Sequence, residues 1–375
     1  MTPFSTLPFP GPMRRILIVK PSSLGDILHA FPLLSALKKF FPQAQIDWVA
    51  NAEFVPLVLR HPAIDRVLPF PRRDFGRGSF FKKMATLLSD LRETPYDAVI
   101  DAQGLLRSAL LARMARRSGR SAPLLGFASA REGAPIFYSQ RLSIPESTDS
   151  PLHAVRRNLL FLEALGCPAQ FSSPDLSSSL RYGEEDRVKI NELLLEAGLL
   201  TGEPFIVLHP GARRESKRWP SQYFSELIQS LARGGYPRPI LVGDRGEAPL
   251  LEEVATRTGV VVPQLPGRLS LDLLPLLLSR AILFIGNDSG PLHMAALAGT
   301  PTISFFGSSD PRRTGPFGDD ERNIVMREPL PCSPCGDFRK FCAHMTCQVS
   351  LTPGAAYHQA VHLLEGRVTS GDRRQ

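Results

Sequence analysis

Residues 16–31 read Ile-Leu-Ile-Val-Lys-Pro-Ser-Ser-Leu-Gly-Asp-Ile-Leu-His-Ala-Phe, and this stretch decides the fold of the first half of the chain. The apolar run 16–19 is typical of a strand buried on both faces of a parallel sheet. After a polar turn, apolar residues recur at helical spacing as far as Leu37. Strand, tight loop and helix in this order predict the first half of a βαβ unit, whose ligands lie beyond the carboxyl end of the strand.

Asp26 follows Gly25 at the expected start of that helix. An aspartate there is either a helix cap or a base, because the helix dipole keeps a carboxylate charged at this end. A glycine beside it allows a ligand or another backbone to come close. Position alone leaves both interpretations open.

The same alternation continues along the chain and predicts an α/β fold with parallel sheets. Strands are expected at 16–19, 45–50, 66–70, 96–101, 205–208, 239–242, 281–285 and 302–306. Helices are expected at 27–37, 54–59, 80–92, 105–116, 151–165, 184–197, 221–232, 250–258, 273–278, 291–297 and 354–364. The Ser-rich segment 172–179 loses periodicity, which marks it as the segment between two doubly wound domains.

The predicted domain organisation follows from these elements. It consists of a loose extension (1–12), an N-terminal domain (13–175), a linker region with a helix (176–203), a C-terminal domain (204–353), and a last helix and tail (354–375).

Length and composition bound the function. A chain of 375 residues suits two domains, and no apolar run reaches the ~18 residues of a spanning helix. A net charge of +8 favours phosphate ligands, nucleic acid or an acidic membrane surface as partner, unless the basic surface is merely solvated. Residues 1–12 do not read as a signal peptide, so we expect a cytoplasmic protein whose functional start is Met13.

Two loops in the second half could hold phosphate. In Asn287-Asp-Ser-Gly-Pro-Leu-His293, Pro291 suits the first helical position and Gly290 lets a phosphate approach the free N–H groups of the helix end. Ser289 could add a hydroxyl, and Asp288 could accept from a sugar hydroxyl or fix the loop. An ordinary helix cap explains the loop equally well.

The basic loop 213–218 follows a buried strand and reads Arg-Arg-Glu-Ser-Lys-Arg. Fixed cations there suit a departing diphosphate, and Lys217 is a compact charge able to follow the leaving oxygen. The alternative is a solvated basic loop.

Other chemistries have no motif. There is no G-x-G-x-x-G after the first strand, no Walker A pattern and no G-x-S-x-G elbow. Cys332, Cys335, Cys342 and Cys347 form a cluster that either holds structural zinc or consists of reduced packing thiols, and we expect the thiols. In both cases the loop is expected to be structural.

Taken together, these segments resemble glycosyltransferase family 9, the bacterial lipopolysaccharide heptosyltransferases. The resemblance covers nearly the whole chain from Met13 to the last helix, and the first half is most like heptosyltransferase I. The cysteine cluster is more like heptosyltransferase II. The similar segments are 16–29, 46–49, 96–104, 130–132, 217–220 and 288–293.

The resemblance implies a GT-B architecture, in which two Rossmann-like, doubly wound domains face a central cleft. It implies transfer of L-glycero-D-manno-heptose from ADP-heptose to the lipopolysaccharide inner core, with inversion and with no tightly bound metal or cofactor. The acceptor would be Kdo-lipid A or heptosyl-Kdo-lipid A, reached from the cytoplasmic face of the inner membrane by peripheral contact. Nucleic acid is not an expected partner.

The resemblance also assigns roles to residues. Asp26 corresponds to the general base and Lys217 to the cation on the donor diphosphate. Donor-binding residues are expected at Lys217, Glu247, Asp288, Ser289, Gly290 and His293, where the family often has Thr in place of Ser289. Acceptor-binding cations are expected among Arg72, Arg73, Arg77, Arg107 and Arg131. Two rival readings remain. One is a different GT-B enzyme, such as a sugar-nucleotide epimerase or a family member that uses another sugar nucleotide or acceptor. The other is a non-enzymatic nucleotide-binding or membrane-associated module.

Overall fold

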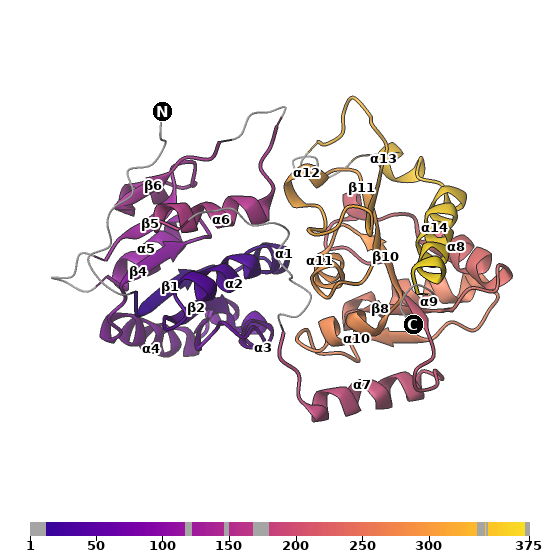
Figure 1. Cartoon of the computed structure of the whole chain (residues 1–375), viewed down its shortest axis with the longest axis horizontal. Coiled ribbons are helices and arrows are strands. Elements are labelled where there is room, and N and C mark those ends of the chain that lie inside the picture. Colours follow the sequence, from indigo (N-terminus) through magenta and orange to yellow (C-terminus); the bar gives the residue numbers. More distant parts are fainter. Residues whose placement is uncertain are drawn as a thin grey trace. The chain divides into compact units, whose positions relative to one another are not determined.

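The computed structural model describes residues 13–116, 122–145, 150–167, 180–335, 342 and 344–371, with the side chains of 367–371 left out. These residues form two compact units, 13–167 with 180–181, and 182–371 (Figure 1). The predicted extension 1–12, the predicted Ser-rich junction at 172–179 and the tail 372–375 lie outside the described residues.

The first unit is built on a six-stranded parallel sheet with the strand order β3-β2-β1-β4-β5-β6. The central strand β1 is buried, and Ile18 lies opposite Trp48 on β2 and Ile100 on β4. The short strand β5 and the edge strand β6 were not predicted. The strands are β1 (Arg15–Val19), β2 (Gln45–Asn51), β3 (Arg66–Phe70), β4 (Ala98–Asp101), β5 (Leu124–Phe127) and β6 (Gln140–Leu142).

Helices cover this sheet, and α4 and α5 share one core with it through Leu17, Leu87 and Ala109. The single helix predicted over 27–37 is wrong, because it is two helices. Pro32 lacks an N–H to donate to the Leu28 carbonyl, and its ring would clash there, so a continuous helix is interrupted. The helices are α1 (Leu24–Leu28), α2 (Phe31–Phe40), α3 (Val55–Leu59), α4 (Ser79–Glu93), α5 (Leu106–Met114) and α6 (Ala154–Ala164), with short 3-10 turns η1 (Ala52–Phe54), η2 (Arg72–Asp74) and η3 (Ala134–Phe137).

The second unit repeats the topology. Its six parallel strands have the order β12-β11-β10-β7-β8-β9, which is the same chain order as in the first sheet. The edge strands β9 and β12 were not predicted. The strands are β7 (Phe205–His209), β8 (Arg238–Gly243), β9 (Gln264–Pro266), β10 (Leu283–Asn287), β11 (Thr302–Phe306) and β12 (Asn323–Arg327).

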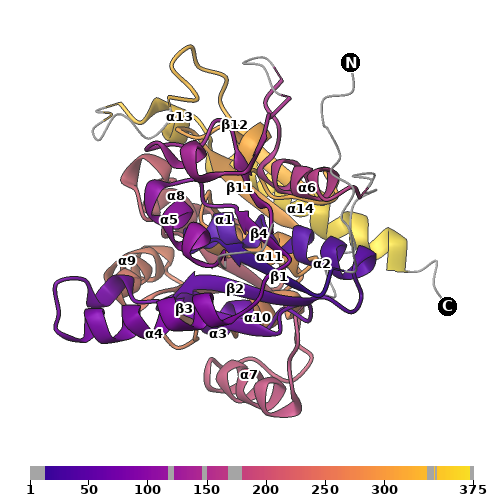
Figure 2. The ribbon, with the colours of Figure 1, turned by 90° about the vertical axis from the view of Figure 1, so that its left-hand side faces the viewer.

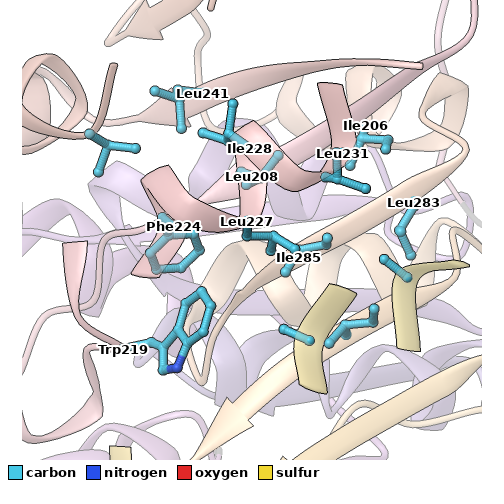
Figure 3. Packing of buried hydrophobic residues seen from close by; sticks show 14 of the residues in the cluster. Ile206, Leu208, Trp219, Phe224, Leu227, Ile228, Leu231, Leu241, Leu283 and Ile285 are labelled. Carbon is cyan, nitrogen blue, oxygen red and sulfur yellow. The ribbon is translucent and has the colours of Figure 1, made fainter. Parts of the chain in front are cut away.

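The core of this unit gathers around Trp219, Phe224 and the apolar face of α8 (Figure 3). The Trp219 ring stacks on Phe305 with centroids 4.0 Å apart, and its Nε1–H donates to the Leu351 carbonyl at 2.7 Å. The helices are α7 (Glu184–Glu196), α8 (Ser221–Arg233), α9 (Ala248–Thr258), α10 (Leu274–Arg280), α11 (Gly290–Leu297), α12 (Pro311–Thr314), α13 (Thr346–Val349) and α14 (Pro353–Gly371), with η4 (Glu215–Lys217) and η5 (Arg245–Glu247).

Two helices that were predicted to link or cross the domains make contacts within the second unit. Helix α7 is tied to α10, because Arg280 Nη1 donates to Asn191 Oδ1 at 2.5 Å. The last helix was expected to pack back on the N-terminal domain, and this stays a prediction. Ala356, Ala360 and Leu364 recur every four residues and are buried in the core of the second unit.

The strand order fixes where ligands can bind. In each sheet the order reverses once, between β1 and β4 in the first unit and between β7 and β10 in the second. Ligands of such sheets lie at the carboxyl ends of the strands at this switch point. The loops that follow these four strands are therefore the places to look for function. Among the described residues, none of the helices is both long and apolar enough to cross a bilayer.

Candidate functional site

In the first unit, Asp26 lies in the first turn of α1, directly after the switch-point strand β1. The Ser23 backbone N–H donates to Asp26 Oδ2 at 3.0 Å, and the Ser23 hydroxyl donates to the same oxygen at 2.7 Å. Asp26 is therefore a capping residue, as one of the two interpretations proposed. Within the described part of the chain its Oδ1 has no hydrogen-bond partner, so one oxygen is left to accept a proton from a ligand.

Lys20 is the charged neighbour that sequence reasoning missed. It is only 8% exposed, and its Nζ donates to the Ala102 carbonyl at 2.9 Å. Burial works to raise the pKa of Asp26, but the Lys20 charge and the Ser23 hydrogen bonds outweigh it and hold this pKa below its ordinary value. Asp26 is consequently a carboxylate at neutral pH.

The loop after β4 completes this switch point. Buried Asp101 accepts from the Tyr138 hydroxyl at 2.7 Å, the Ser108 hydroxyl at 3.0 Å and the backbone N–H groups of the next turn, which fixes that turn. Burial raises the pKa of Asp101 in spite of these bonds. Gln103 Oε1 accepts from the Ser22 N–H at 3.1 Å, so this β4 turn also holds the loop that carries Asp26.

The five arginines predicted to bind an acceptor are all exposed and lie on three segments. Arg131 is next to the β4 turn, because its N–H donates to the Gly104 carbonyl at 3.0 Å, and Arg107 is in the first turn of α5. Arg72, Arg73 and Arg77 lie on the separate connection between β3 and α4. Their role in binding an acceptor stays a prediction.

In the second unit, Lys217 and Asp288 meet across the switch point. Lys217 Nζ lies 2.6 Å from Asp288 Oδ2, and the Ser309 hydroxyl donates to the same oxygen. His293 Nε2 lies 3.7 Å from Oδ1. Burial works to raise the pKa of Asp288, but the His293 hydrogen bond and the Lys217 charge hold it well below its ordinary range. Asp288 thus remains charged and fixes the position of Lys217.

Helix α11 begins beside this pair, with Ser289 as its N-cap and Gly290 as its first residue (Figure 1). The sequence predicted Pro291 as the first helical residue, but it is the second. The Ser289 hydroxyl lies 3.3 Å from His209 Nδ1 and makes no cap hydrogen bond. The N–H groups of this helix end are therefore not occupied by their own cap side chain, which suits a phosphate.

Glu247 is the remaining predicted donor residue, and it is anchored by local contacts. The Asp244 N–H donates to Glu247 Oε2 at 2.9 Å, and His209 Nε2 lies 3.4 Å from that oxygen. A side chain at Gly211 would collide with this carboxylate, so a larger residue there would have to displace Glu247. Burial works to raise the pKa of Glu247, but the hydrogen bond and charge of His209 hold it below its ordinary value. His209 was also missed, although its place at the end of β7 could have indicated it.

Asn287 ties the two switch-point loops of this unit together. Its Nδ2 donates to the Pro210 carbonyl at 2.8 Å, and its Oδ1 accepts from the Trp219 N–H at 2.9 Å. The buried Asn287 thereby fixes the β7 loop, which carries Lys217, against the β10 loop, which carries Asp288. The structure brings together Lys217, Asp288, Ser289, Gly290 and His293 as one cluster, with Glu247 joined to it through His209.

The cysteine loop lies beside this cluster. Cys347 packs on Gly307, and the Ser333 hydroxyl donates to the Gly307 carbonyl at 2.6 Å. Gly307 directly precedes the segment whose Ser309 contacts Asp288. No group of three or more metal-ligating side chains close enough to hold a metal occurs among the described residues, which include all four clustered cysteines.

Comparison with known proteins agrees with this arrangement. The family model described as glycosyltransferase family 9 (heptosyltransferase) matches residues 84–344. Lipopolysaccharide heptosyltransferase 1 of Pseudomonas aeruginosa is 33% identical over 340 residues, which is 88% of this chain and 88% of the relative. The corresponding protein of Escherichia coli K12 is 31% identical and covers 84% of this chain and 94% of its own length.

Solved structures give the same result. The E. coli heptosyltransferase WaaC with ADP superposes with a TM-score of 0.71 at 29% identity, and the match covers 93% of this chain and 99% of WaaC. The predicted GT-B fold class is thus confirmed at the level of two Rossmann-like α/β domains. The match of the family model over most of the chain, together with these relatives, shows that the chain belongs to glycosyltransferase family 9.

Proposed function

We propose that this protein is the inverting glycosyltransferase that moves L-glycero-D-manno-heptose from ADP-heptose to the Kdo region of the lipopolysaccharide inner core. The observation that carries the proposal is the cationic cluster in the second unit, where Lys217 is held by buried Asp288 at the start of α11. WaaC structures named for ADP and for an ADP-2-deoxy-2-fluoro heptose support this choice of donor at 29% and 28% identity.

The proposed reaction is one displacement. An acceptor hydroxyl forms a bond to the anomeric carbon while the bond from that carbon to the phosphate oxygen breaks. The proton goes to Asp26 Oδ1, and ADP leaves with the extra negative charge. Because one displacement occurs, the anomeric configuration inverts and no covalent nucleophile is needed.

Leaving-group stabilisation falls to the second unit. The Lys217 ammonium and the N–H groups at the start of α11 present positive charge without any metal, and such preorganised charge is typically worth about 3–4 kcal/mol per contact in the transition state. Ser289 adds a hydroxyl whose position is fixed by His209. Glu247, held by the same histidine, is proposed to meet the nucleoside end of the donor.

The proposed acceptor is Kdo-lipid A, because the relatives at 29–33% identity over most of the chain include several named lipopolysaccharide heptosyltransferase 1. Its phosphates and Kdo carboxylates suit the exposed arginines. Arg131 is bonded to Gly104 in the β4 turn, and Arg107 lies in the first turn of α5, which follows that turn. Such an acceptor also requires peripheral contact with the cytoplasmic face of the inner membrane.

Mass spectrometry tests this proposal. The protein is incubated with ADP-heptose and, separately, with Kdo-lipid A and heptosyl-Kdo-lipid A, and the mass of each lipid is followed. Addition of one heptose to Kdo-lipid A is the expected result. Addition only to the heptosylated lipid would move the protein to the second heptose transfer. Turnover of neither lipid, with transfer from another sugar nucleotide, would overturn the choice of donor.

A further inference from the structure

Helix α5 has an unpaired apolar face. Leu106, Leu110 and Met114 recur every four residues and therefore lie on one side of the helix, where they are 39%, 40% and 38% exposed. The opposite side buries Ala109 and Ala112 in the core beneath the sheet. A helix of a water-facing layer normally places polar residues outward, and none of the core clusters formed by the described residues includes this second apolar stripe.

Further apolar side chains lie on the same helical layer. Ile136, in η3, is 71% exposed, and η3 shares the core of α5 through Ala134. Phe81, in the first turn of α4, and Phe75, in the connection before it, are 78% and 79% exposed, and α4 packs in the same core as α5. The Phe80 ring joins them edge to face, at 5.4 Å from Phe75 and 5.7 Å from Phe81. Helices α4 and α5 can be followed in Figure 2.

Exposed arginines outnumber the carboxylates close to the apolar stripe of α5. Residues 106–114 contain Arg107 and Arg113, both exposed, and no Asp or Glu. Of the carboxylates closest to these side chains, Asp74 is paired with Lys83 at 2.8 Å. Glu132, which accepts from the Leu106 N–H at 3.2 Å, directly follows the exposed Arg131. The surface is therefore apolar and positively charged together, which is the composition of segments that bind anionic bilayers.

The surface also begins at the candidate catalytic edge. Gly104 belongs to the turn that accepts the Lys20 hydrogen bond and holds the loop of Asp26, and helix α5 starts two residues after it. A membrane against α5 would thus lie close to the residue proposed to act on the acceptor.

We propose that this docking surface, formed by Phe75, Phe81, Leu106, Leu110, Met114 and Ile136 with Arg107 and Arg113 beside them, seats the protein on an anionic bilayer. The apolar side chains enter the boundary between headgroups and acyl chains, and the cations contact anionic headgroups. A second copy of the chain is a poorer occupant, because a two-fold contact would place the same cations against each other. The inference rests on the proposed function only in explaining why the protein would dock, namely to reach a lipid acceptor. Docking itself requires neither donor nor acceptor.

Vesicle sedimentation tests the surface without any turnover. Full-length protein is mixed with phosphatidylethanolamine vesicles that contain phosphatidylglycerol, and with neutral phosphatidylcholine vesicles, across a salt series. Wild type should bind the anionic vesicles at low salt, and the binding should weaken as salt rises. The double substitutions Leu110→Ser/Met114→Ser and Phe75→Ser/Phe81→Ser should each weaken binding about tenfold or more, from the loss of partly exposed apolar area. Both pairs are exposed, and circular dichroism and melting temperature check that the variants fold.

The matched control is Leu195→Ser/Leu200→Ser, which removes two leucines that are 51% and 74% exposed in the second unit. It should bind vesicles as wild type does. Wild-type binding by both docking-surface variants, or no binding by wild type at low salt, would overturn the inference. Loss of self-association in the variants, with no vesicle binding by any protein, would assign the surface to a second copy and also overturn it. Failure of heptose transfer in a detergent-dispersed assay would instead count against the proposed function and leave vesicle binding unaffected.

Discussion

The ion pair between Lys217 and Asp288 offers the sharpest prediction. Lys217→Ala removes the cation and leaves Asp288, whose side chain is 5% exposed, with Ser309 and His293 as its remaining partners among the described residues. The substitution should therefore reduce both the stability of the second unit and the rate of transfer. Asp288→Asn removes the buried charge instead, while Lys217, at 21% exposure, can still reach water.

Removing one partner of a buried pair lowers the free energy of unfolding by about 3–5 kcal/mol. Because Asp288 keeps two other partners, we expect a loss of about 3 kcal/mol for Lys217→Ala. For a unit of this size each kcal/mol shifts the melting temperature by about 2–4 °C, so a fall of roughly 6–12 °C is expected. In the reaction, loss of the cation should raise the barrier by about 2–4 kcal/mol, which lowers kcat/KM roughly 30- to 900-fold.

A double-mutant cycle measures the coupling energy between Lys217 and Asp288. Lys217→Ala/Asp288→Asn removes the stranded charge, so it should be more stable than Lys217→Ala alone by at least about 1 kcal/mol. Denaturant unfolding gives the free energies, and steady-state kinetics with ADP-heptose give kcat/KM. Lys189→Ala, an exposed lysine on α7, is the control and should change neither quantity. Additive losses in the cycle would show that Asp288 does not depend on Lys217 for its charge and would refute the account of this pair.

Three further predictions follow from the described contacts. Asp26→Asn keeps a side-chain oxygen for the Ser23 cap, so it should preserve the fold and ADP binding while lowering kcat by roughly two or more orders of magnitude; near-normal turnover would remove Asp26 as the base. Because the pKa of Asp288 is depressed from its ordinary 3.8, the unfolded state takes up a proton in acid before the folded state does. The stability that wild type gains over Asp288→Asn should therefore be full above about pH 4 and fall below it. Acid titration of both proteins checks this, and a difference in stability that widens in acid would contradict it. Chelation should leave transfer unchanged, because the thiols of the cysteine loop are expected to be structural; stoichiometric zinc whose removal unfolds the second unit would show the opposite.

The parts of the fold that depend on local pattern were predictable. Buried strands such as 16–19 and 205–208 are continuous apolar runs, and each lies at the centre of its sheet. The edge strands β6 and β9 have three residues each and carry polar or proline residues, so periodicity gives no signal for them. The direction in which α14 packs depends on which surface accepts Ala356, Ala360 and Leu364, and the helix sequence alone does not contain that information.

The candidate site was predictable in its charged loops and unpredictable in their supports. Asp26, Lys217 and Asp288 follow central strands and could be identified by position and resemblance. Lys20 and His209 end those same strands, but only the fold shows that Lys20 reaches the β4 turn and that His209 lies between Glu247 and Ser289. Such supporting contacts join residues about 80 positions apart, beyond the reach of any local pattern.

The central claim is a direct displacement in which Asp26 takes the acceptor proton as ADP departs beside Lys217. Nuclear magnetic resonance of the isolated product, prepared from ADP-heptose of known anomeric configuration and Kdo-lipid A, measures the outcome at the reacting carbon. The account predicts a new glycosidic bond with the configuration opposite to that of the donor. A product that retains the donor configuration would require a covalent or front-face mechanism and would contradict the account.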